Sequence, residues 1–264
     1  MVPGGGGRRG RGTEGRAVAA VTRTDLFRCG LRTLALQAAW SFGSLQSVGF
    51  AWAVEPALRR IHGRGEGYRE ALARHLEFFN THPFLAAAVV GAVVRLEEEG
   101  APADDIRRFK NAVMGPCGAL GDSFFWAGLK PALLAAAAAL AWAGVGWSPL
   151  VFVAAFGAVG LAFRAVWLLR GYRRGPAVAQ DLARAGFLPG SLVLKDMAAA
   201  CIGGAVVLAL GRGLGGAAGV EAWAWGAAGA VVAVVASQAV RRGLRVEWLV
   251  VAWGSACMAL GVWW

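Results

Sequence analysis

The second half of the chain, from Pro131 to Trp264, is mainly a succession of apolar stretches long enough to cross a lipid bilayer. A spanning helix needs roughly 20 consecutive apolar residues. Acidic residues interrupt this half only at Asp181, Asp196, Glu221 and Glu247. The whole chain is 57% hydrophobic and 16% charged, whereas soluble domains are about 45–50% apolar and about 25% charged. The sequence therefore predicts an all-α membrane protein with about five transmembrane helices.

Positive charge gives these spans a predicted orientation. Arginine clusters at 170–174 and 241–245 fall on the same side if the spans alternate, and the positive-inside rule places that side in the cytoplasm. No signal peptide is recognisable, so the N-terminus is also expected there. We therefore expect a multi-pass protein of the cell inner (plasma) membrane, with a short cytoplasmic amphipathic segment at Pro176–Pro189. The predicted spans are Pro131–Trp147, Leu150–Leu169, Leu192–Leu210, Trp223–Val240 and Trp248–Trp264.

The net charge of +11 is compatible with two kinds of partner. Nucleic acid is one, but arginines that flank apolar spans favour anionic lipid headgroups instead. Residues 1–23 are predicted to be a disordered basic leader because they are rich in glycine and arginine. The four cysteines are dispersed without ligand spacing, so we expect neither a disulfide framework nor a metal site, and no cofactor.

Residues 24–130 form a predicted N-terminal helical region, followed by a transmembrane bundle over 131–264. Thr24-Asp25 is a predicted helix cap, and an apolar-rich stretch continues to about Leu58 as an N-terminal amphipathic helix. Four polar residues are spaced so that they share one helical face, namely Thr33, Gln37, Ser41 and Ser44. Two interpretations stay open: an interfacial helix that shows this face to water, or a polar stripe that lines a path between helices.

Phe84–Val94 is apolar but too short to span a bilayer. We expect it to be either buried against partner protein or re-entrant, since membranes tolerate such a segment only where protein or a cavity covers its ends. The acidic run at Glu97, Glu98 and Glu99 that follows is predicted to be a solvated loop.

Two long motifs carry a family resemblance. His75–Pro83 reads HLEFFNTHP, and Lys110–Trp126 reads KNAVMGPCGALGDSFFW. In this order they resemble the two signatures of the IID subunit of mannose/fructose/sorbose-family sugar phosphotransferase systems. Leu96-Glu97-Glu98 also matches the family pattern, and the resemblance extends over about residues 24–200.

The resemblance implies a function shared among subunits. IID acts in the membrane with IIC, soluble IIA and IIB carry the phosphate, and a hexose is translocated and phosphorylated by IIB. IID is not itself a phosphocarrier, so no catalytic residue is expected in this chain. The family's first helix carries an amide, a carboxylate and a base where this sequence has Ser41, Gly43 and Ser44. This departure keeps an alternative open: a non-transporting assembly or regulatory subunit.

Candidate sugar-binding residues come from the two motifs and the first helix. Sugar recognition needs amide and carboxylate groups beside an aromatic platform. Asp122 has two compatible interpretations: an N-cap of a helix over Phe124–Leu134, or a broken-helix end that offers its carboxylate to sugar hydroxyls. Asn80 and Thr81 could likewise cap the helix that Pro83 begins. The predicted site residues are Gln46, Asn80, Thr81, Asp122, Ser123 and Trp126.

Overall fold

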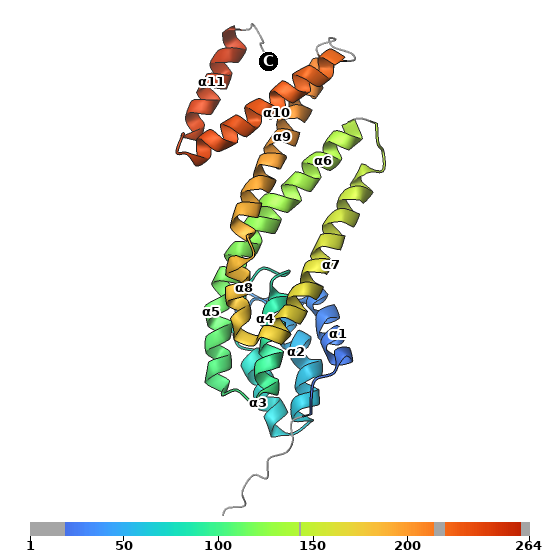
Figure 1. Cartoon of the computed structure of the whole chain (residues 1–264), viewed down its shortest axis with the longest axis vertical. Coiled ribbons are helices and arrows are strands. Elements are labelled where there is room, and N and C mark those ends of the chain that lie inside the picture. Colours follow the sequence, from blue (N-terminus) through green and yellow to red (C-terminus); the bar gives the residue numbers. More distant parts are fainter. Residues whose placement is uncertain (1–18, 143, 214–219, 260–264) are drawn as a thin grey trace, which may run out of the picture.

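A computed structural model describes residues 19–142, 144–213 and 220–259, and all regular elements within these ranges are helical. The predicted all-α membrane class is confirmed. The described part of the chain is elongated: α1 to α5 gather at one end, and α6, α7, α9 and α10 extend away from it (Figure 1). The helices are α1 (Arg23–Arg32), α2 (Ser47–His62), α3 (Glu66–His75), α4 (Ala86–Glu98), α5 (Ala103–Gly121), a π-helical segment η2 (Asp122–Leu129), α6 (Lys130–Trp142), α7 (Ser148–Arg174), α8 (Val178–Arg184), α9 (Phe187–Gly213), α10 (Val220–Arg241) and α11 (Val246–Ala259).

Four helical stretches in the described residues are long and apolar enough to cross a membrane, namely Ala103–Trp142, Ser148–Arg184, Phe187–Val207 and Ala224–Arg241. They correspond to the first four predicted spans. The fifth prediction overlaps α11, and its last residues, 260–264, lie outside the described part. The predicted amphipathic segment between the second and third spans is α8, which buries Val178 and Leu182.

The short apolar segment is α4, and the chain itself covers it. Every residue from Leu85 to Val94 is buried. Its main neighbour is α7, and two glycines let the two backbones touch: a Cβ at Gly91 would lie 2.1 Å from the Leu168 carbonyl oxygen, and one at Gly171 would lie 2.2 Å from that of Ala88. The segment is thus buried as expected, but by the chain's own helices and not by a partner protein.

The predicted continuous N-terminal helix is wrong. α1 begins two residues earlier than expected because Thr22, not Thr24, caps it: Thr22 Oγ1 accepts from Asp25 N at 3.2 Å, and the Asp25 carboxylate accepts from Thr22 N at 3.1 Å. After a short 3-10 turn at Thr33–Ala35, residues 36–46 form turns before α2 begins. The four polar residues therefore do not share a helical face, since Thr33 is buried while Gln37 and Ser41 are exposed.

The predicted cap or helix break at Asp122 is also wrong. α5, η2 and α6 form one uninterrupted helix from Ala103 to Trp142, with Pro116 inside it. Residues Asp122–Leu129 form a π-helical segment, which lets the helix continue past Asp122 without a break. The predicted boundary between residues 130 and 131 falls inside this helix, so the N-terminal region continues directly into the first span.

Candidate functional site

The first motif forms a loop to which Gln46 is hydrogen-bonded. The buried Gln46 carboxamide donates through Nε2 to the Thr81 carbonyl at 2.8 Å and accepts from Thr81 N at 3.1 Å. Its backbone N also donates to the Phe79 carbonyl at 2.8 Å. Leu45, just before it, has a φ of 52°, a left-handed conformation that is rare for a non-glycine residue. The turn of residues 36–46 thus brings Gln46 into contact with the loop of the first motif.

The second motif packs on the same loop. Thr81 Oγ1 donates to the Met114 carbonyl at 3.1 Å, and Asn80 N donates to the Met114 sulfur at 3.4 Å. One turn further along the helix, the position of a Cβ on Gly118 would lie 4.0 Å from Thr81 Cα. The two motifs, separate in sequence, therefore meet in one place.

His82 fixes this meeting point through an aromatic cluster. Its ring stacks on Phe125 with centroids 4.9 Å apart, and Trp126 lies 4.9 Å away. Its Nδ1 accepts from Phe84 N at 3.2 Å. Gly121 is required here because a Cβ would lie 2.2 Å from the His82 ring. Sequence reasoning did not include His82 among the site residues, although it belongs to the first motif.

Three predicted site residues remain exposed around this cluster: Asn80, Asp122 and Trp126. Asp122 follows Gly118 and precedes Trp126 by one turn each, so the three share one side of the helix. The Lys130 ammonium lies 5.4 Å from the centre of the Trp126 ring. We call Asn80, Asp122 and Trp126 the motif rim: an amide, a carboxylate and an indole around the junction of the two motifs.

The other three predicted residues lie elsewhere. Gln46 and Thr81 are buried and bonded to each other, so in this structure they support the loop. Ser123 faces α9, where its Oγ lies 3.1 Å from Ser191 Oγ and 3.4 Å from Lys195 Nζ. The structure therefore does not bring all six residues together.

The acidic run forms the end of α4 rather than the solvated loop that the sequence suggested: Glu97 and Glu98 belong to α4, and only Glu99 is exposed. The side chain of Glu97 is 2% exposed and lies at the centre of a buried ionic cluster. Arg74 binds both carboxylate oxygens, at 2.8 and 3.2 Å, and His62 Nε2 and His75 Nε2 each lie 2.9 Å away. Lys110 of the second motif adds a bond from Nζ to the Arg74 carbonyl at 2.7 Å. This cluster ties both motifs to the end of α4.

Burial and hydrogen bonding have opposite effects on the pKa of Glu97. Burial acts to raise the pKa of Glu97, but hydrogen bonds from His62, His75 and Arg74 outweigh it and hold that pKa well below its usual range. Burial lowers the pKa of His75 to about 4, against the opposing effect of its bond to Glu97. At neutral pH the cluster therefore holds a charged Glu97 and a neutral His75.

Comparison with known families identifies the motifs. The family model for the IID component of the mannose/fructose/sorbose-family phosphotransferase system matches residues 20–214, well over half of the chain. The chain belongs to this family. The resemblance predicted from the two motifs is thereby confirmed, and all residues of the motif rim lie inside the matched range.

Individual IID proteins match over a shorter range. The mannose-specific EIID component of Escherichia coli (strain K12) is 37% identical over 174 residues, which is 64% of this chain and 61% of that protein. The fructose permease IID component of Bacillus subtilis (strain 168) is 35% identical over 168 residues, 62% of this chain and 61% of the relative. The match thus spans about 61% of the length of these relatives.

Solved structures match over more of the chain. A cryo-EM structure of the mannose transporter ManYZ in complex with microcin E492 contains a chain with 27% identity and a TM-score of 0.58, covering 92% of this chain and 98% of that one. A second structure, of a membrane protein, gives 26% identity and a TM-score of 0.61, with 91% and 97% coverage. The structural similarity therefore covers more of the chain than the sequence matches do.

Proposed function

We propose that this chain is the IID membrane subunit of a mannose-family sugar phosphotransferase permease in the cell inner (plasma) membrane. It acts with a IIC subunit to translocate a hexose, which IIB phosphorylates after receiving phosphate from IIA. The observation that carries the proposal is the meeting of both family motifs at one rim, where polar and aromatic groups stay exposed on a rigid, buried support.

The motif rim has the chemistry that sugar recognition requires. A carboxylate accepts hydrogen bonds from hydroxyls, a carboxamide both donates and accepts, and an indole face packs on the apolar face of a sugar ring. Asn80 and Asp122 are exposed, and Trp126 is 39% exposed although its ring also contacts Lys130 and Phe156. Gln46 and Thr81 hold the loop, and we therefore assign direct sugar contact to the rim and a positioning role to these two residues.

We place the contact surface for the IIC partner on the N-terminal turn. Phe42 is 93% exposed, and the exposed Trp40 packs edge-on against it with ring centroids 5.0 Å apart. Trp52 on α2 is also exposed, with the Arg32 guanidinium 4.8 Å from its ring centre. Aromatic side chains grouped on a surface are typical of interface cores. We also expect the basic ends of α7 and α10 to meet anionic lipid headgroups.

The alternative, a non-transporting relative, rests on Ser41, Gly43 and Ser44. These residues lie on the turn before α2, where Ser41 Oγ and Ser44 Oγ are 3.0 Å apart. They are outside the motif rim, so their substitution leaves the rim chemistry intact. This placement favours transport.

Uptake measurements test the proposal. The chain is co-expressed with IIC, IIA and IIB in a strain that lacks other permeases, and phosphorylation-coupled uptake of labelled mannose is measured. We expect uptake, and we expect Asp122→Asn to reduce it at least about a hundredfold, because a carboxylate that binds hydroxyls in the translocation path is lost. Asp104→Asn is the matched control, since Asp104 is exposed earlier in the same helix and pairs with Arg107.

Two outcomes would contradict the transport function. Absence of uptake by a complex that co-purifies with IIC would leave only the assembly role. An equal loss of complex and of uptake in Asp122→Asn would show that Asp122 is structural. Phe42→Ser tests the partner surface separately: we expect the yield of co-purified IIC to fall while the chain itself stays folded.

A further inference from the structure

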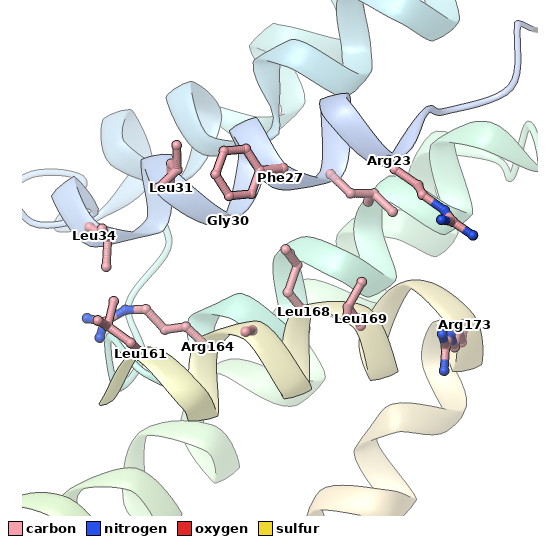
Figure 2. A pocket seen from close by; sticks show the side chains of 12 residues that line it. Arg23, Phe27, Gly30, Leu31, Leu34, Leu161, Arg164, Leu168, Leu169 and Arg173 are labelled. Carbon is pink, nitrogen blue, oxygen red and sulfur yellow. The ribbon is translucent and has the colours of Figure 1, made fainter. Parts of the chain in front are cut away.

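An apolar groove of about 660 Å³ lies between α1 and α7 (Figure 2). The two helices come closest at Gly30, where a Cβ would lie 3.0 Å from Leu168 Cδ2. Apolar side chains line the rest: Leu26, Phe27 and Leu31 from α1, Leu34 from the 3-10 turn that follows it, and Leu161, Ala165, Leu168 and Leu169 from α7.

The apolar side chains that line the groove are exposed, so they need contact with an apolar ligand or an apolar solvent. Phe27, Leu31, Leu34, Leu161 and Leu169 are all exposed. Contiguous exposed apolar surface on a protein marks an interaction site. α7 is one of the candidate spans, so a groove along it is open to lipid from the bilayer, and a lipid acyl chain fits its shape and chemistry.

Charge is concentrated at one end of the groove. Figure 2 shows the Arg23 and Arg173 side chains at the same end, on opposite helices. Their neighbours are engaged elsewhere: Arg170 and Arg174 pair with Asp181 at 3.1 and 3.2 Å. Within the described part of the chain, neither Arg23 nor Arg173 has an acidic partner. Two guanidinium groups therefore face the end of an apolar groove without an anion.

The arginine at the other end of the groove, Arg164, is partly buried and contacts protein, although its Nε has no hydrogen-bond partner among the described residues. The Arg164 guanidinium lies 4.1 Å from the centre of the Phe84 ring, and its Nη1 donates to the Gly160 carbonyl at 3.4 Å. The groove is thus polarised, with two unpaired cations at one end and an apolar path leading away from them.

We propose that this groove binds one anionic phospholipid, with its phosphate between Arg23 and Arg173 and an acyl chain along the apolar lining. Guanidinium groups bind phosphate in a bidentate manner, and basic pockets between membrane helices bind anionic headgroups. A helix of a partner protein would need acidic residues placed at this end to pair both cations, whereas one anionic phospholipid supplies both the anion and the apolar chain, so the charge favours the lipid. The proposal does not depend on sugar transport.

Native mass spectrometry of the full chain in a neutral detergent tests the site. The probes are phosphatidylglycerol and phosphatidylcholine with the same acyl chains. We expect the chain to retain phosphatidylglycerol preferentially, and the double variant R23Q/R173Q to bind it about 20-fold more weakly. R28Q/R64Q is the matched control: it removes the same charge from exposed positions outside the groove lining and leaves binding unchanged.

A second variant tests the apolar part. Ala165→Phe places a ring in the groove without touching either arginine, and we expect it to weaken retention of phosphatidylglycerol while the chain elutes as one peak in size exclusion. Glycerol phosphate, which has the charge but no acyl chain, should not displace the lipid.

Three results would overturn the proposal. The first is equal loss of lipid in both double variants, which would indicate a nonspecific charge effect. The second is displacement by glycerol phosphate, which would indicate a simple anion site. The third is unchanged retention in R23Q/R173Q, which would leave the groove as a surface for a partner protein.

Discussion

α4 and α10 are both apolar helices, yet they lie in opposite environments. In α4, Val90 and Val93 are 0% exposed. In α10, Val231, Val232 and Val235 are 62%, 65% and 61% exposed. Figure 1 shows α4 inside the cluster of N-terminal helices and α10 at the far end of the molecule. Apolar composition alone therefore does not predict whether a helix of this chain is buried in the protein or exposed on its surface.

Length explains the difference. α10 is long enough to span a bilayer, so lipid can solvate its exposed valines. α4 has 13 residues and is too short for this, and the protein supplies its cover instead. α4 accordingly has close glycine contacts with α7 and an ionic cluster at its end. Each prediction below tests whether this contrast holds.

The largest effect is expected at Gly91 on α4. Gly91→Leu would place a Cβ 2.1 Å from the Leu168 carbonyl oxygen and 2.7 Å from Tyr172 N. Because both atoms belong to the backbone of α7, the helices must separate, and we expect no folded protein by fluorescence-detected size exclusion. Gly157→Leu on α7 is the control, because nothing lies within 4 Å of its Cβ position. A folded Gly91→Leu protein would refute the close packing of α4 and α7.

Loss of the charge at Glu97 comes next. Glu97→Gln leaves Arg74, only 11% exposed, without its anion. Breaking a buried ion pair costs about 3–5 kcal/mol, and we expect a loss of this size in thermal unfolding of the detergent-solubilised chain. Glu99→Gln is the control: its bond to Arg95 is on the surface, where a pair contributes about 0–1 kcal/mol. Equal effects would mean that the cluster is solvated after all.

The same cluster predicts a pH dependence. The pKa of His75 falls from 6.5 in the unfolded chain to about 4 in the fold, and that of Glu97 is also lowered. The unfolded chain therefore binds more protons, and stability must fall as pH decreases. We expect the melting temperature to drop as pH is lowered from 6.5 towards 4, and further as Glu97 protonates. A melting temperature that rises over this interval would contradict the assignment.

A smaller effect is expected at Gln46. Gln46→Ala removes both bonds to the Thr81 backbone and leaves buried polar groups unpaired, at a cost of about 2 kcal/mol. The loss should appear in thermal unfolding without any sugar present, as a positioning role requires. Gln37→Ala, on the exposed turn, is the control. If Gln46→Ala changes uptake but not stability, Gln46 contacts the sugar directly.

The smallest effects compare the two helices directly. Val90→Thr in α4 buries a hydroxyl in an apolar core, which costs about 1–3 kcal/mol. Val232→Thr in α10 makes the same isosteric change on an exposed face, and we expect a change within about 0.5 kcal/mol in detergent. The measurement is the difference in melting temperature between the two variants. An equal fall in melting temperature for both variants would show that Val232 of α10 is buried in the assembly. An unchanged melting temperature for both would show that Val90 of α4 is not buried.

Much of the fold could be predicted because it depends on composition along the chain. Span length and charge asymmetry placed the four candidate spans near their observed positions, and the two motifs identified the family. Helix continuity could not be predicted at Gly115–Ser123, where glycine, proline and aspartate resemble a break. The helix instead runs through this stretch without a break and continues as the π-helical segment η2 from Asp122. The role of Gln46 was also hidden, because its partner Thr81 is distant in sequence.

The sequence by itself determined that the chain needs a membrane and that it carries the IID motifs, since both follow from residue types in order. Only the tertiary structure decided which apolar helix is buried and which acidic residue is solvated. Glu97 and Glu99 are two residues apart, yet one lies inside an ionic cluster and the other on the surface. The physical reason is that burial and ion pairing depend on neighbours that the fold brings together from distant parts of the chain.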